Sequence, residues 1–340
     1  GVWIMAYTTI DNPELYFQAL AWSGNDVGTS RAFTFDGSED MQPDLVWTKI
    51  RTGWSAKHNL WDPVRGATKN LSSDASTAET TTDQYGYVSA FGTDGFTGSN
   101  GTSTHNSRYL YNENGGTYVA WCWKESADAG FDINIHTGTG SSADVSHNLS
   151  AVPELIITKR RNDTQNWFVY TSTTGAQKAL YLDTTSAEAT QAAAYDATPT
   201  SSVINYGSDN AVNGSSDTYV AYLWRSVQGF SKIGSYEGNN NADGTFVYTG
   251  FRPAYVITKV TDTTDGWMIF DNKRNPHNVM NFYMTADGVG ADSTRDSIDF
   301  VSNGFKLRVA NTDCNNGSYI YMAFAEAPFV NSNGVPNNAR

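Results

Sequence analysis

The chain has 340 residues, of which 17% are charged and 13% are aromatic, and its formal net charge at pH 7 is −13. Aromatic side chains in this number supply enough apolar surface to offset the chain entropy lost on folding, which argues against disorder. The acidic excess opposes nucleic-acid binding, because phosphate binding depends on clustered Lys and Arg. We expect a folded protein with no nucleic-acid partner.

No stretch approaches the ~18 consecutive apolar residues of a membrane-spanning helix, so we expect no membrane insertion. Residues 1–4 lack the basic start of a signal peptide, and we expect Met5 to be the native start, with the four residues before it an extension. The two cysteines, Cys122 and Cys314, make neither a disulfide framework nor a zinc-ligand pattern. The fold should therefore not depend on oxidation, which fits synthesis in a reducing cytoplasm.

Residues 1–25 precede any repeated motif and are interpreted as a lead-in. Asn12 followed by Pro13 is typical of a helix start, because an Asn side chain caps the first turn and proline suits the first helical position. We expect a helix over Asn12–Leu20. A second, weaker helix is expected over Ser186–Ala194.

Two motifs recur along the rest of the chain with similar spacing inside each copy, which is the mark of an internal repeat. The first motif occurs at Pro43–Lys49, Pro153–Lys159 and Pro253–Lys259. The second motif occurs at Thr117–Trp123, Thr218–Trp224 and, more loosely, Ser318–Phe324. The pattern predicts three repeats at residues 26–127, 128–227 and 228–329, followed by a tail at residues 330–340.

Both motifs have the character of strands. The first is a short β-branched run after a proline, and the second is apolar at nearly every position, as in a strand buried on both faces. Between them lie dipeptides that favour tight hairpin turns: Asn100-Gly101, Asn114-Gly115, Asp243-Gly244, Asn303-Gly304 and Asn316-Gly317. The sequence therefore predicts an all-β fold of three tandem β-sandwich-like repeats with few short helices.

Two further motifs occur in only two copies. Asp62–Arg65 resembles Asp271–Arg274, so Arg65 and Arg274 are candidates to bind an anion or a sugar acid, and the alternative is that each forms an ion pair with its own aspartate. Leu71–Glu79 resembles Leu180–Glu188. The recurrence of acidic residues in both copies favours a structural role over catalysis, because Asp and Ser side chains commonly close local turns.

Aromatic residues are the richest resource for recognition, since their faces suit sugars and proteins. Most tryptophans fall in strand-like runs and are expected in the core. Trp54 lies instead in the loop-like segment Arg51–Lys57. We therefore expect Trp54 to be exposed and to be a candidate binding residue.

No local signature of catalysis is found. The five histidines have no zinc-ligand spacing, and no nucleophile elbow, phosphate-binding loop or dinucleotide fingerprint occurs. The loop Asp287–Asp292 could offer oxygen ligands to calcium but lacks the EF-hand spacing. We expect no catalytic residue, no metal site, no cofactor and no enzymatic activity.

Several segments together resemble a repeat family from tailed bacteriophages, frequent in marine and cyanobacterial phages, whose members are usually called structural or tail-fibre-like proteins. These segments are Met5–Gln18, Gln42–Lys49, Leu60–Lys69, Asp94–Phe96, Gly116–Lys124, Gly250–Tyr255 and Ala323–Phe329. The resemblance extends from about Met5 to Arg340. It implies a virion protein and assigns no catalytic residue.

On this basis we expect a non-enzymatic virion protein, a tail-fibre or surface-appendage component that binds a host-surface glycan or protein. It would be made in the cytoplasm of the host bacterium, reside on the virion surface, contact other virion proteins and form a homo-oligomer, which we expect to be a trimer. One alternative is a capsid-bound decoration or head-fibre protein. Another is a tailspike-like enzyme that cleaves glycans, which should show two carboxylates in a cleft, one with a raised pKa.

Overall fold

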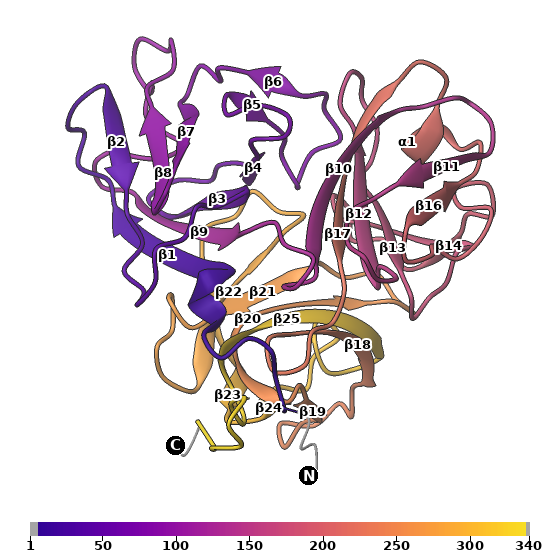
Figure 1. The fold of residues 1–340 in the computed structure, drawn as a ribbon. Helices are drawn as coiled ribbons and strands as arrows, with labels where there is room; N and C mark the ends of the chain where they lie inside the picture. The colour runs from indigo at the N-terminus through magenta and orange to yellow at the C-terminus, as the bar shows by residue number, and fades with distance from the viewer. Residues whose placement is uncertain (1–5, 338–340) are drawn as a thin grey trace.

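The prediction of an all-β fold is confirmed by the structure, a computed structural model that describes residues 6–337 (Figure 1). Within this range, only two short helices accompany the strands: η1 (Pro13–Leu15), a single 3₁₀ turn, and α1 (Asn210–Asn213). No helix in this part of the chain is long and apolar enough to cross a membrane. The expected start at Met5 lies outside the described residues.

Both helices expected from the sequence are wrong. Asn12 does cap η1, its Oδ1 accepting from the Glu14 amide at 3.1 Å, but strand β1 begins at Phe17, because pairing with a neighbouring strand overrides the local helix signal. The segment Ser186–Ala194 instead contains a two-residue strand, β15 (Ala189–Thr190).

Sheet 1 has the strand order β1-β9-β3-β4 and is faced by a smaller sheet of order β2-β8-β7. Buried side chains such as Val46 and Phe96 fill the space between the two sheets, so this part of the chain is a β-sandwich. The strands are β1 (Phe17–Ser23), β2 (Ser30–Phe33), β3 (Leu45–Thr52), β4 (Asn59–Trp61), β7 (Tyr87–Gly92), β8 (Gly95–Ser99) and β9 (Thr117–Trp123), with the hairpin β5 (Lys69–Asn70) and β6 (Thr80–Thr81) alongside.

Sheet 2 has the order β10-β17-β12-β13-β14-β15 and is accompanied by the pair β11-β16. Its strands are β10 (Phe131–Thr137), β11 (Ala143–Ser146), β12 (Leu155–Arg160), β13 (Phe168–Thr171), β14 (Lys178–Tyr181), β15, β16 (Val203–Tyr206) and β17 (Thr218–Trp224).

Sheet 3 is the largest, with the order β18-β25-β20-β21-β22-β23-β24-β19. Its strands are β18 (Ser231–Glu237), β19 (Phe246–Tyr248), β20 (Phe251–Val260), β21 (Met268–Asp271), β22 (Met280–Thr285), β23 (Ser293–Val301), β24 (Gly304–Leu307) and β25 (Ser318–Pro328). In Figure 1 the three sheets follow one another along the chain, in indigo to purple, magenta to salmon, and orange to yellow.

The two recurring motifs are neighbouring strands at the same register in all three sheets. Lys49 lies opposite Val119 and Lys159 lies opposite Val220. Lys259 lies opposite Ile320 in sheet 3. On its other side the second motif pairs with an edge strand, which is β1, β10 or β18. Strand β1 lies in the segment interpreted as a lead-in, so sheet 1 begins before residue 26.

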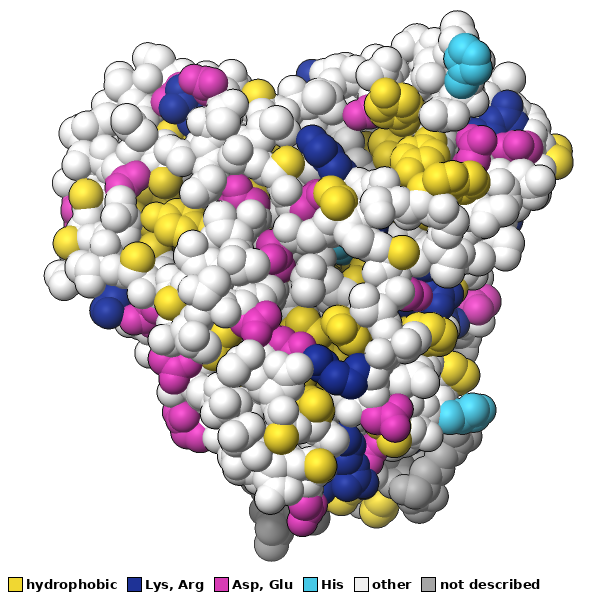
Figure 2. Space-filling view, turned by 180° about the vertical axis from the view of Figure 1, so that it is seen from behind, with side chains coloured by type: hydrophobic (Ala, Val, Ile, Leu, Met, Phe, Trp, Pro, Cys, Tyr) yellow, Lys and Arg dark blue, Asp and Glu magenta, His cyan; other side chains and the backbone are white. Residues whose placement is uncertain are grey.

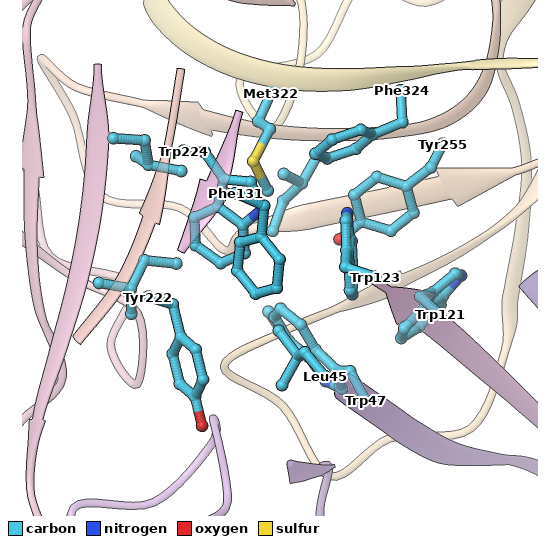
Figure 3. Packing of buried hydrophobic residues seen from close by; sticks show 14 of the residues in the cluster. Leu45, Trp47, Trp121, Trp123, Phe131, Tyr222, Trp224, Tyr255, Met322 and Phe324 are labelled. Atoms are coloured by element: carbon cyan, nitrogen blue, oxygen red, sulfur yellow. The ribbon is translucent and has the colours of Figure 1, made fainter. Parts of the chain in front are cut away.

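The three sheets share one hydrophobic core (Figure 3). Trp123 is the meeting point: its ring centroid lies 6.2 Å from that of Trp224 in sheet 2 and 5.6 Å from that of Phe324 in sheet 3. All three rings stand at the same register position of the second motif. Each sheet therefore buries one face against the other two sheets and the opposite face against its own small cluster.

Buried lysines join each sheet to the next in a cyclic pattern. The Lys49 Nζ donates to the Val289 carbonyl beside sheet 3 at 3.1 Å, and the Lys159 Nζ donates to the Ser76 carbonyl beside sheet 1 at 3.2 Å. The third contact runs from the Lys259 Nζ to the Thr185 carbonyl beside sheet 2, also at 3.2 Å. Burial lowers the pKa of each of these lysines to about 8.

We predict that Trp123→Ala lowers the free energy of unfolding by about 3–5 kcal/mol, because it opens a cavity where the three sheets meet. Urea denaturation measures the change. Tyr248→Ala, which truncates an exposed ring on the edge strand β19, is the control and should stay within about 0.5 kcal/mol of wild type. Equal losses for the two variants would contradict a shared core.

We also predict a pH dependence carried by the buried lysines. Because the pKa of Lys159 is about 8 in the folded protein and 10.5 unfolded, unfolding takes up protons between these values, and the free energy of unfolding rises with pH across that window. Relative to Lys159→Met, wild type should gain up to about 3 kcal/mol from pH 8 to 10.5. The exposed Lys232, changed to Met, is the matched control. Parallel pH profiles for wild type and Lys159→Met would refute the assignment.

Candidate functional site

Arg65 and Arg274, the candidate anion-binding residues, both have fully buried side chains. The Nε of Arg65 bonds Asp62 at 2.5 Å, and its other nitrogens bond Glu79 at 3.1 Å and the Leu60 carbonyl at 2.8 Å. These acceptors surround the guanidinium with protein groups. The ion-pair alternative is therefore the one that the structure shows for Arg65, and no surface is left to meet an anion.

Arg274 repeats this arrangement in sheet 3. It bonds Asp271 at 2.5 Å, Asp292 at 2.8 Å and the Ile269 carbonyl at 2.8 Å. Burial of such a charge is costly unless it is paired and hydrogen-bonded, and both arginines meet this condition. The structure does not bring Arg274 together with Trp54 or Arg65 in one site.

The acidic partners of the two arginines also join the sheets. Glu79 pairs with a second arginine, Arg161, at 3.0 Å, and Arg161 directly follows β12 of sheet 2. Asp292 pairs with Arg51 of sheet 1 at 2.8 Å. Sheet 2 has no equivalent aspartate. In sheet 3 Asp271 lies opposite Tyr255, and at the corresponding position of sheet 2 Thr171 lies opposite Leu155. The arrangement therefore occurs at two of the three contacts between sheets, which explains why its motif occurs twice.

We predict that Glu79→Gln destabilises the protein by about 3–5 kcal/mol, because it leaves two neighbouring guanidinium groups without their shared carboxylate. Glu188→Gln is the matched control, since Glu188 pairs with the partly exposed Lys178 and should contribute about 1 kcal/mol or less. Chemical denaturation of both variants measures the difference. Similar losses for both would show that Glu79 is no more important than a surface pair.

Trp54 is exposed, with 40% of its surface accessible, in the loop between β3 and β4. Its ring lies 5.7 Å from that of Tyr109, which in turn lies 6.4 Å from the ring of Tyr85. Three aromatic rings from three loops thus lie next to one another. In Figure 2 a hydrophobic patch is visible in a hollow at the upper right, the side of the molecule that sheet 1 occupies.

Two of these rings, Tyr85 and Tyr109, line a pocket of about 410 Å³. Its other walls are mostly neutral hydrogen-bonding side chains, among them Asn59 of β4, Asn70 of β5 and Asn106 of the loop before β9. One cation, Lys57, and one carboxylate, Asp83, complete the polar lining. Aromatic surface with a few convergent polar groups is the usual composition of a small-molecule site.

The loops around the pocket are held by hydrogen bonds. The hydroxyl of Tyr109 donates to the Ser55 carbonyl at 3.0 Å, and the Leu110 amide donates to the Tyr85 carbonyl at 3.0 Å. Gly101 packs so closely on the backbone of Gln84 that a Cβ there would lie 2.2 Å from it, so only glycine fits. The aromatic rings are therefore positioned before any ligand arrives.

Asn70 lines the pocket, and most of its side chain is buried. Its Nδ2 donates to Asn59 Oδ1 at 2.8 Å, and Asn59 in turn donates to the Lys57 carbonyl at 2.9 Å. The Oδ1 of Asn70 is buried and has no hydrogen-bond partner within residues 6–337. An unmade hydrogen bond of this kind costs about 1–3 kcal/mol of stability.

Sequence reasoning found Trp54 but missed Tyr85, Tyr109 and Asn70. The two tyrosines stand in polar, turn-rich segments, the same context that singled out Trp54, and this signal could have found them. Asn70 gives no such signal, because its position depends on the pairing of β5 with β6.

The sequence pattern of a protein family described as a domain of unknown function (DUF7483) matches residues 12–328. The chain belongs to the DUF7483 family. No curated protein and no solved structure matches it.

The buried histidines of this DUF7483 chain have structural roles. His58 accepts from the Trp47 indole at 2.9 Å and bonds the Thr285 carbonyl at 3.0 Å, which joins sheets 1 and 3, and burial lowers its pKa. No group of three or more His, Cys, Asp or Glu able to hold a metal ion occurs among residues 6–337. In the loop Asp287–Asp292, Asp287 accepts from the Trp267 amide and Asp292 binds two arginines, Arg51 and Arg274.

One carboxylate of the DUF7483 chain, Glu125, has a raised pKa and a second carboxylate beside it. Burial, with a hydrogen bond to Asp132, raises the pKa of Glu125 to about 7. Glu125 lies in the connection between β9 and β10, where it accepts from the Ile133 amide at 3.3 Å, and Ser226 accepts from the Ile233 amide in the corresponding connection between β17 and β18. Because a serine accepts the equivalent hydrogen bond there, stabilisation of the turn accounts for Glu125. Neither Glu125 nor Asp132 lines the aromatic pocket.

Proposed function

We propose that this chain is a structural protein of a bacteriophage virion, a tail-fibre or other surface-appendage component that binds a glycan on the host cell. The pocket beside Trp54 carries the proposal, because it combines exposed aromatic rings with amide and hydroxyl groups on preset loops. Aromatic rings supply large contact area at low entropic cost, and short polar side chains supply adaptable hydrogen bonds. The virion location rests on the resemblance to phage proteins described above.

A homo-oligomer, for which we propose a trimer, would present several copies of the pocket at once. Linked sites raise the apparent affinity well above that of one site, because the second binding event becomes intramolecular. A pocket of modest affinity is therefore sufficient for attachment to a cell surface.

The binding prediction is tested by applying the purified protein to an array of bacterial surface polysaccharides. Trp54→Ala and Tyr109→Ala should each weaken binding of the best ligand about tenfold or more, because each removes a stacking surface. The exposed Tyr248, changed to Ala, lies in sheet 3 and should leave binding unchanged.

Two further observations separate the proposal from its alternatives. New reducing ends in the polysaccharide after incubation would identify an enzyme. Stoichiometric binding to emptied capsids, without binding to host cells, would identify a decoration protein. Density for the chain on an appendage of the virion that contains it would support the proposal directly.

A further inference from the structure

We infer that the pocket beside Trp54 is selective for an uncharged saccharide and excludes acidic ones. This inference rests on the proposed function, and it names the class of ligand that the same pocket takes.

Charge is the first argument. The described lining holds one cation, Lys57, and one carboxylate, Asp83, and no arginine. Arginine is the side chain best suited to a sugar carboxylate, because its planar fork matches two oxygens at once. The whole chain carries a net charge of −13, which repels a polyanion. In the pocket an acidic polysaccharide would therefore find one cation, Lys57, offset by Asp83, and the chain as a whole would repel it.

Hydrogen bonding is the second argument. The neutral polar side chains that line the pocket are three amides and three hydroxyls: Asn59, Asn70, Asn106, Ser72, Thr77 and Thr80. Amides and hydroxyls both donate and accept, as sugar hydroxyls do. Acidic sugars carry hydroxyls as well, so these groups favour a saccharide in general, and the charge of the lining decides between neutral and acidic ones.

Shape is the third argument. The volume of about 410 Å³ lies at the small end of the roughly 300–1,000 Å³ typical of small-molecule sites. The Tyr85 and Tyr109 rings form one wall, and Trp54 continues the row of rings outside the pocket. This arrangement suits a short oligosaccharide, with one sugar unit inside and the next against Trp54.

The test is isothermal titration calorimetry with two sets of short oligosaccharides as probes. The neutral set contains oligomers of glucose, mannose, galactose and N-acetylglucosamine, and the acidic set contains oligogalacturonate and oligosialic acid. At least one neutral probe should bind, with an affinity that changes little between low and high salt, since no ion pair is formed. The acidic probes should bind at least about tenfold more weakly.

Asn70→Ala should weaken the best neutral probe about tenfold or more, because it removes one of the three amides that line the pocket. Asn205→Ala is the matched control: Asn205 of β16 also has a buried Oδ1 without a partner in the described chain, but it lies outside the pocket. Thermal unfolding verifies that both variants fold. If Asn70→Ala does not fold, the selectivity and salt dependence of wild type decide the question.

The outcomes are distinguishable. A preference for acidic probes that falls with salt would overturn the inference and leave glycan binding standing. Failure of every probe and of every polysaccharide on the array would overturn both the inference and the proposed function.

Discussion

The structure depends on one constraint: three sheets must bury their inner faces against a single set of aromatic rings. The three copies of the second motif end with Trp123, Trp224 and Phe324, and these side chains occupy the same register position in their sheets. A sheet that presents such a face to water loses the main stabilising contribution to its folding, which is the burial of apolar surface. The three sheets are therefore expected to unfold together and not one by one.

Polar contacts decide how the sheets meet around that core. A purely apolar contact tolerates rotation and sliding, whereas a buried lysine or arginine must find its acceptors. Lys49, Lys159 and Lys259 each reach a carbonyl beside the neighbouring sheet, and the Arg65 and Arg274 networks add fixed geometry at two of the three contacts. Buried ion pairs contribute little net stability, so we assign them the role of fixing the mutual orientation of the sheets.

The all-β fold could be predicted because its signals are local: β-branched runs after proline, continuous apolar strands and glycine-containing turns. The helix expected at Asn12–Leu20 failed because its apolar residues are used by a strand, and only the pairing of Phe17 with Trp123 reveals this. The burial of Arg65 could not be predicted either. Asp62 is close to Arg65 in the sequence, but Glu79 belongs to a separate hairpin and Arg161 lies beside another sheet, so only the folded structure brings them together.

The candidate pocket shows how equivalent loops acquire different surfaces. In each sheet the connection before the second-motif strand is held by a tyrosine hydroxyl that donates to a carbonyl in that connection. Tyr118 donates to Tyr109, Tyr219 donates to Asn210, and Tyr319 donates to Thr312, at 2.6–3.0 Å.

This tyrosine-to-carbonyl hydrogen bond, the anchor, is thus the same in all three sheets. The residue whose carbonyl accepts it is aromatic only in sheet 1. An aromatic ring at this position adds nothing to the anchor, because the hydrogen bond uses the backbone carbonyl. Tyr109 places its ring between Trp54 and Tyr85 instead. The ring is present at one of three equivalent positions and lies beside other exposed rings, which supports the proposal that this surface binds a ligand.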